Sequence, residues 1–216
     1  MLQDTLILLS NLEFDFQPVI SFYPEEKLSI LKDIINQFQP TISKMFLNRI
    51  QYFAQKGHSN GERFASAFNS AFSFNRNSSV IIIGADSPHI SANILIEAIN
   101  DLSTSPKSAI IGPSQTGGFY IFGLNNNINN LSSLFDTDHE CNNLKNICSK
   151  ESISVKIYPY LFDIDELEDI KLLHDLFKSN ESIVHYTNNN FTSNLKYNFP
   201  RQTIKFLKDK GYFFNY

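Results

Sequence analysis

The fold is indicated most clearly by residues 80–88, which read Val-Ile-Ile-Ile-Gly-Ala-Asp-Ser-Pro. An unbroken apolar run of this kind predicts a strand that is covered on both faces, which is typical of the middle of a parallel sheet flanked by helices. We therefore expect residues 80–83 to form a central parallel strand that is nearly inaccessible to solvent. Asp86 then follows at the carboxyl edge of the sheet, where open α/β sheets bind ligands.

Helical and strand patterns alternate on both sides of this stretch. Ser59 and Glu62 have the spacing of a capping box, which opens a predicted helix over residues 63–72, and Ser91 begins another over 92–102. Further predicted strands span residues 19–23, 109–111, 119–122 and 153–158, and further helices span 2–10, 25–38, 43–54, 138–149, 166–177 and 200–210. Together they predict an α/β protein with a single domain over residues 1–216. Its C-terminal extension is divergent from about residue 179.

The composition argues against several classes of function. With 18 Lys and Arg against 22 Asp and Glu, the chain lacks the positive field of a general nucleic-acid binder. No segment approaches the roughly 20 apolar residues of a membrane-spanning helix. Cys141 and Cys148 cannot by themselves form a disulfide framework or a zinc site, and we interpret them as small buried hydrophobes. We expect a soluble, cytoplasmic protein that contacts neither nucleic acid nor a membrane.

Three loops follow predicted strands and could carry chemistry. In the first loop, Asp86 could hold a divalent metal or a ribose hydroxyl, or it could cap the following turn. In the second loop, Gly117 and Gly118 would let the backbone approach a ligand closely, although a plain hairpin loop has the same pattern. No Gly-Lys-Ser/Thr follows, so the second loop is not a phosphate-binding P-loop.

The third loop alternates carboxylates, with Asp163 and Asp165 after a predicted strand. Both could supply oxygen ligands to Mg²⁺ or Mn²⁺. For Asp165 we favour the alternative, in which it is the N-cap of the next helix and Glu166, Glu168 and Asp169 stabilise the first turn. For Asp163 we favour the metal site.

Taken together, these segments resemble one known family. Residues 80–91 resemble its strand followed by Gly-Ser/Thr-Asp-Cys-Pro, and residues 111–124 resemble its Gly-Pro-Ala-x-Asp-Gly-Gly-Tyr-Tyr motif. Residues 163–169 are similar to its Asp-hydrophobic-Asp-Thr-x-Glu-Asp motif, and residues 57–63 to its Gly-x-x-Gly-Glu-Arg element. The family is an uncharacterised, glycosyltransferase-A-like group of nucleotide-diphospho-sugar transferases, related to the molybdenum-cofactor and phospholactate guanylyltransferases. The resemblance covers about residues 2–175.

This resemblance implies a Rossmann-like three-layer α/β/α sandwich of the glycosyltransferase-A type, with a nucleotide or nucleotide-sugar as its ligand. Asp86 would be catalytic and would coordinate Mg²⁺ or Mn²⁺ together with Asp163. The implied substrate-binding residues are Glu62, Arg63, Ser87, Pro88, Thr116, Gly117 and Gly118. Asp86 and Asp163 should then lie close enough to share one cation, with the Thr116–Gly118 loop facing them.

Two departures from the family pattern leave two functions open. The family begins with a strand and a basic, glycine-containing loop that grips the nucleotide, whereas this sequence starts at the helix that follows them. Thr116 also stands where the family has an acidic residue. The protein is either a metal-dependent nucleotidyl- or glycosyltransferase, truncated at Met1 or divergent, or a non-catalytic module that binds a ligand or partner. Because sheet edges are normally covered, we expect the missing strand's place to be filled by residues such as 212–214 or by a second subunit in a homo-oligomer.

Overall fold

The computed structural model describes residues 1–74, 79–105, 107–137, 139–178 and 200–212. The helices are α1 (Leu2–Ser10), α2 (Leu28–Asn36), α3 (Lys44–Arg49), α4 (Asn60–Phe74), α5 (Ala92–Thr104), α6 (Glu140–Lys150), α7 (Leu167–Lys178) and α8 (Arg201–Asp209). The strands are β1 (Val19–Phe22), β2 (Gln51–Ala54), β3 (Val80–Ile83), β4 (Ser108–Pro113), β5 (Phe119–Leu124) and β6 (Ser154–Ile157). Short 3-10 helices are η1 (Glu25–Lys27), η2 (Gln115–Gly117) and η3 (Leu131–Ser133). Among the described residues, every helix is too short or too polar to cross a bilayer.

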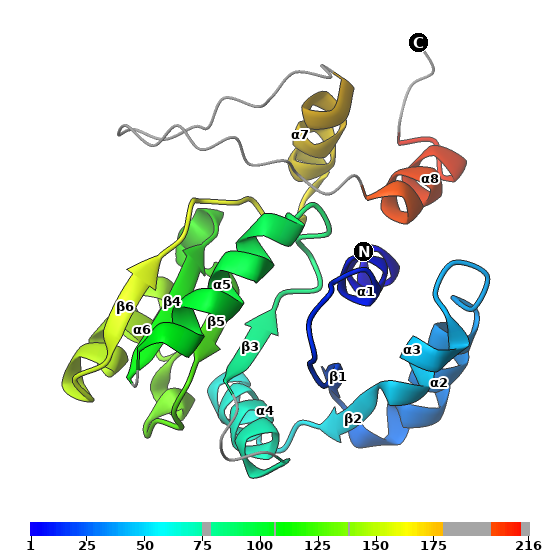
Figure 1. Cartoon of the computed structure of the whole chain (residues 1–216). Coiled ribbons are helices and arrows are strands. Elements are labelled where there is room, and N and C mark those ends of the chain that lie inside the picture. The colour runs from blue at the N-terminus through cyan, green and yellow to red at the C-terminus, as the bar shows by residue number, and fades with distance from the viewer. Residues whose placement is uncertain (75–78, 106, 138, 179–199, 213–216) are drawn as a thin grey trace.

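A four-stranded mixed sheet forms the centre of the protein, with the order β3-β5-β4-β6 (Figure 1). Strand β5 runs antiparallel to both β3 and β4, while β4 and β6 are parallel. Helices cover both faces of the sheet. On one face, Ile111 and Phe122 pack with α4 and α6, and on the other face Ile110 and Ile121 pack with α5 and α1. This arrangement is a three-layer α/β/α sandwich.

The predicted central position of β3 is wrong, although its apolar character is explained. Val80 and Ile82 pack toward the α4–α6 side and Ile81 and Ile83 toward the α5 side, so both faces are covered as expected. The strand nevertheless lies at the end of the sheet, antiparallel to β5, and its residues are only partly buried. An apolar pattern on both faces of a strand indicates that helices cover it above and below. The pattern does not indicate which strands pair with the two edges of that strand.

The N-terminal part has a sheet of its own, in which β1 and β2 pair in parallel. Its core joins α1, α2 and α3 through Leu6, Ile35, Phe46 and Leu47. The predicted helix over residues 43–54 is therefore too long. Ile50 adopts an extended conformation that ends α3, and the following residues pair with β1.

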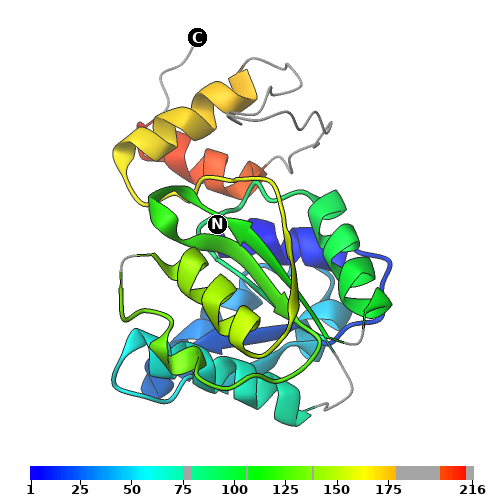
Figure 2. The ribbon, with the colours of Figure 1, turned by 90° about the vertical axis from the view of Figure 1, so that its left-hand side faces the viewer.

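Helices α7 and α8 lie together at one end of the molecule, beyond the end of β3 (Figures 1 and 2). Their shared core contains Leu173, Ile204 and Leu207, with Phe162 and Ile164 from the loop before α7 packed against it. The predicted polar segment 179–199 lies outside the described residues.

The expected filling of a mid-sheet gap is not seen within the described part of the chain. No described strand pairs with the second edge of β3, and β1–β2 forms a separate sheet. Residues 213 and 214 of the aromatic tail lie outside the described residues, and filling by a second subunit stays a prediction.

Candidate functional site

Two of the predicted loops meet at the carboxyl end of β3. The backbone N–H of Ile164 donates to the carbonyl oxygen of Asp86 at 3.0 Å. Beside it, the Ser87 hydroxyl donates to the carbonyl oxygen of Phe162 at 3.5 Å. The loop after β3 is therefore hydrogen-bonded to the loop before α7. These bonds hold the backbone of Asp86 next to the segment that contains Asp163.

The remaining loop, which carries Gly117 and Gly118 between β4 and β5, contacts the same acidic segment, the loop before α7 with Asp163 and Asp165. The Ser114 hydroxyl donates to Asp163 Oδ2 at 3.0 Å, and Ser114 also forms an isolated parallel β-bridge with Leu161. Gly117 has a φ of +90°, a conformation that glycine adopts without strain and that supports the predicted need for glycine here. All three loops thus converge, as the sequence predicts.

The carboxylates of this cluster repel one another. Burial raises the pKa of Asp86, and the charge of Asp165 raises it further, while a hydrogen bond from its own backbone N–H opposes the shift. Burial also raises the pKa of Asp163, with smaller contributions from the charges of Asp165 and Asp86, against the lowering effects of the Ser114 hydroxyl and of its own backbone N–H. Ionised carboxylates so arranged favour a cation between them.

The backbone at Gly84 allows the Asp86 carboxylate to fold back over it. A Cβ placed on Gly84 would lie 2.5 Å from Asp86 Oδ1, which is far closer than two such atoms can approach. The glycine that ends β3 is therefore required for the observed orientation of Asp86, and a side chain there would displace the carboxylate.

The predicted N-cap role of Asp165 is taken by another residue. Asp169 Oδ2 accepts the backbone N–H groups of Asp165 and Glu166 at 3.0 and 2.8 Å, and its Oδ1 accepts Gln115 Nε2 at 2.6 Å. The exposed Asp165 side chain makes no hydrogen bond in the described part of the chain. An acidic residue in the first turn of a helix can bond back to the N–H groups before it, and Asp169 does so here.

Glu62 and Arg63 have structural contacts at the start of α4. Glu62 Oε2 accepts the backbone N–H groups of His58 and Ser59, and the Ser59 hydroxyl accepts the N–H of Glu62, which confirms the predicted capping box. Arg63 lies over the ring of Tyr23, 4.5 Å from its centre, and donates to the carbonyl oxygen of His58. Substrate binding by Glu62 and Arg63 stays a prediction.

Ser87 and Pro88 are buried beneath the site, and Ser87 is fully inaccessible. The next residue, His89, is also inaccessible and lies 4.2 Å from the ring of Phe162, and burial lowers its pKa to about 3. These residues fix the first loop against the acidic loop. A direct role of Ser87, Pro88 or the Thr116–Gly118 backbone in substrate binding stays a prediction.

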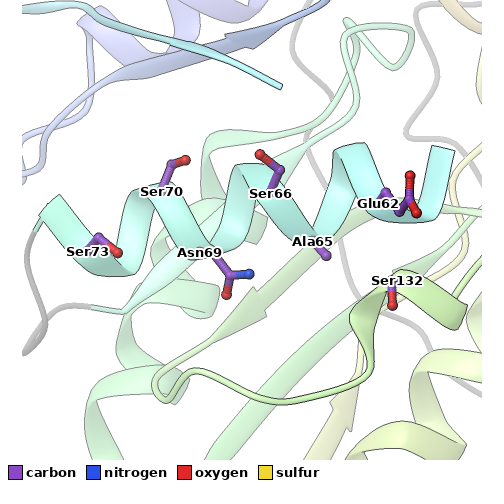
Figure 3. A pocket seen from close by; sticks show the side chains of 7 residues that line it. All are labelled: Glu62, Ala65, Ser66, Asn69, Ser70, Ser73 and Ser132. Atoms are coloured by element: carbon purple, nitrogen blue, oxygen red, sulfur yellow. The ribbon is translucent and has the colours of Figure 1, made fainter. Parts of the chain in front are cut away.

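A hollow of about 580 Å³ lies elsewhere, along α4 (Figure 3). In Figure 3, Ala65 and Asn69 point toward Ser132 of η3, while Ser66 and Ser70 point to the other side of the helix. Among the described lining residues Glu62 is the one that is ionisable, and its carboxylate already caps α4. Since the described lining otherwise offers serine hydroxyls and one amide, we place the candidate chemistry at the three loops instead.

The carboxylates fit a metal ion only if other ligands complete its shell. Among the residues that the structure describes, no three Asp, Glu, His or Cys side chains are grouped closely enough to hold an ion by themselves. Asp163 Oδ1, however, is buried and has no hydrogen-bond partner among the described residues. Mg²⁺ is often held by one or two carboxylates, with waters and substrate phosphates as its remaining ligands. Asp86 and Asp163 are compatible with an ion of this kind.

Comparison with known proteins agrees with this architecture. The sequence model of a family described as "Uncharacterized protein conserved in bacteria (DUF2064)" matches residues 32–138. No protein of curated function matches the chain.

Two solved structures share the fold. A proposed nucleotide-diphospho-sugar transferase from Desulfovibrio desulfuricans G20 is similar over 99% of this chain and 83% of its own, with a TM-score of 0.63 and 21% identity. A cytidylyltransferase from Leptospira borgpetersenii is similar over 97% of this chain and 83% of its own, with a TM-score of 0.52 and 16% identity. Residues 32–138 therefore resemble this uncharacterised bacterial family, and the fold of the chain is shared with the proposed nucleotide-diphospho-sugar transferase.

Proposed function

We propose that the protein is a metal-dependent nucleotidyl- or glycosyltransferase that acts on a nucleotide or nucleotide-sugar. The observation that carries the proposal is the convergence of Asp86 and Asp163, whose loops are hydrogen-bonded to each other at the carboxyl end of β3. The fold shared with nucleotide-sugar and cytidylyl transferases supports the same class of substrate.

In this proposal Asp86 and Asp163 would hold Mg²⁺ or Mn²⁺. When bound, such an ion neutralises phosphate charge and favours departure of a phosphate-containing leaving group. The remaining task of the protein is to orient the acceptor against the nucleotide. The backbone of Gly117 and Gly118 would admit the ligand beside the carboxylates, while Ser87 would hold the first loop in place.

One observation favours the second candidate, a non-catalytic ligand-binding module. Among the described residues, no Lys or Arg contributes to the pKa shift of Asp86 or Asp163. Transferases of phosphate-containing groups usually have cationic side chains near the transferred charge. A nucleotide that binds without turnover would identify this second function.

The two functions can be separated by titrating Mn²⁺ into the protein by calorimetry, with and without a panel of nucleotides and nucleotide-sugars. We expect nucleotides to strengthen Mn²⁺ binding, and we expect Asp86→Asn to remove the effect. Asp33→Asn is a matched control, because Asp33 is an exposed residue of α2. Release of pyrophosphate from nucleoside triphosphates, in the presence of sugar phosphates, would then report nucleotidyl transfer. A well-folded protein that binds neither Mn²⁺ nor any nucleotide would refute both candidates.

A further inference from the structure

Two adjacent polar side chains join the β4–β5 loop to the acidic segment. Ser114 donates to Asp163 Oδ2 at 3.0 Å, and Gln115 donates through Nε2 to Asp169 Oδ1 at 2.6 Å. Asp169 in turn holds the backbone N–H groups of Asp165 and Glu166. The segment that carries Asp163 is thus held at two points, Asp163 and Asp169, by consecutive residues of one loop.

The backbone around Ser114 makes this connection rigid. Its N–H donates to the carbonyl oxygen of Gly118 at 3.0 Å, and the N–H of Leu161 donates to the carbonyl oxygen of Pro113 at 3.1 Å. Ser114 itself is 2% exposed, so water cannot easily replace its hydroxyl. The carbonyl oxygen of Gln115 is a second acceptor within reach at 3.3 Å, but the closer and negatively charged Asp163 is the stronger one.

The connection makes the two oxygens of Asp163 different. Oδ2 accepts the Ser114 hydroxyl, whereas Oδ1 is buried and has no hydrogen-bond partner in the part of the chain that the structure describes. A buried carboxylate oxygen without a partner is costly unless a ligand satisfies it. Residues that bond to one oxygen of a metal-binding carboxylate orient the other one, and their loss typically weakens metal binding by 10- to 100-fold.

We propose that Ser114 and Gln115 are positioning residues of the transferase site, which hold the Asp163 segment so that Oδ1 is the oxygen presented to the cation. This inference rests on the proposed metal-dependent function. Neither residue contacts the cation in this proposal. They act through Asp163 and Asp169 respectively.

The test compares Ser114→Ala and Gln115→Ala with Ser108→Ala in the chain of 216 residues. Ser108 is a matched control, because it lies at the other end of β4, is 8% exposed and hydrogen-bonds to Asn125. We expect Ser114→Ala to weaken Mn²⁺ binding about tenfold, Gln115→Ala about threefold, and Ser108→Ala not at all. The thermal midpoint of each variant without metal shows whether the protein is folded.

Amide hydrogen exchange without metal provides a readout that does not depend on the proposed function. We expect the amides of residues 161–166 to exchange faster in Ser114→Ala and Gln115→Ala than in Ser108→Ala. If the two variants exchange faster but the wild-type protein binds no Mn²⁺, the positioning role is supported and the metal-dependent function is refuted. Unchanged exchange in this segment would overturn the inference, as would unchanged or tighter Mn²⁺ binding by Ser114→Ala when the wild type binds Mn²⁺. If Ser114→Ala does not fold, the same criteria apply to the partly exposed Gln115→Ala.

Discussion

Asp4 attaches the C-terminal helix α8 to the N-terminal helix α1. Its Oδ1 accepts the backbone N–H of Gln202 at 2.9 Å, and its Oδ2 accepts the N–H and the hydroxyl of Thr203 at 2.8 and 2.7 Å. The N-cap residue of α8 is Pro200, which supplies no side-chain cap, so a residue far away in the sequence caps this helix. Because Asp4 is 2% exposed, water cannot substitute for it.

The substitution Asp4→Asn should weaken this attachment strongly while it preserves the shape of the side chain. Hydrogen bonds to a charged group contribute about 1.5–3 kcal/mol each. An asparagine keeps one acceptor oxygen, loses the charge that interacts with the helix N-terminus, and turns its own N–H groups toward the donors of α8. We expect a loss of about 3 kcal/mol in the free energy that holds α8 in place.

Hydrogen exchange of the α8 amides measures this loss directly. About 3 kcal/mol corresponds to roughly 150-fold faster exchange, because each 1.4 kcal/mol is a factor of ten. If α8 unfolds together with the rest of the chain, the thermal midpoint should fall by roughly 6–12 °C. Asp33→Asn again serves as the control. If the α8 amides of Asp4→Asn exchange at the same rate as in the control, and its thermal midpoint is also the same, Asp4 does not hold the helix.

Three further predictions concern the site and the core. Asp86→Asn should raise the free energy of unfolding at pH 7, because the pKa of Asp86 is raised above 3.8 in the folded state and its ionisation therefore opposes folding. Chemical denaturation at several pH values should show that this gain in stability disappears below about pH 3.8, where Asp86 is protonated in both states. Cys148, inaccessible and with its pKa raised to about 11 by burial, and the nearly buried Cys141 should react with a thiol reagent only after denaturation. Gly61→Ala should lower the stability by about 2 kcal/mol in chemical denaturation despite the better helix propensity of alanine, because the new Cβ would lie 1.9 Å from the carbonyl oxygen of Ser132.

Features encoded over a few residues were predictable from the sequence. The capping box of Ser59 and Glu62 and the N-cap of α5 by Ser91 are both present, because each joins residues three apart in the chain. The alternation of helices and strands, and the placement of Asp86 after an apolar strand, required only local pattern. The family motifs then placed Asp163 beside it, a relation that local pattern alone does not contain.

The contacts that complete the site were not predictable in the same way. Ser114 and Asp163 are 49 residues apart, and serine in a loop is too common to indicate that it bonds to a distant carboxylate. Asp169 was expected only to stabilise the first turn of a helix. No pattern in the sequence indicates that it also accepts a hydrogen bond from Gln115. Residues 51–54 form a strand because β1 is available for pairing, which overrides the helical pattern of the preceding residues.

The position of β3 links the fold to the candidate site. The Gly84 N–H donates to the carbonyl oxygen of Tyr120, so Val80, Ile82 and Gly84 direct their backbone groups toward β5. The backbone groups of Ile81 and Ile83 then point to the other edge, which no described strand pairs with. Asp86 lies just beyond the carboxyl end of β3. The main chain that orients Asp86 is therefore supported by β5 on one side and by the Asp163 loop beyond its end. We therefore expect the contacts of the Asp163 loop with the loops that follow β3 and β4 to contribute more to the position of Asp86 than they would beside a strand paired on both edges.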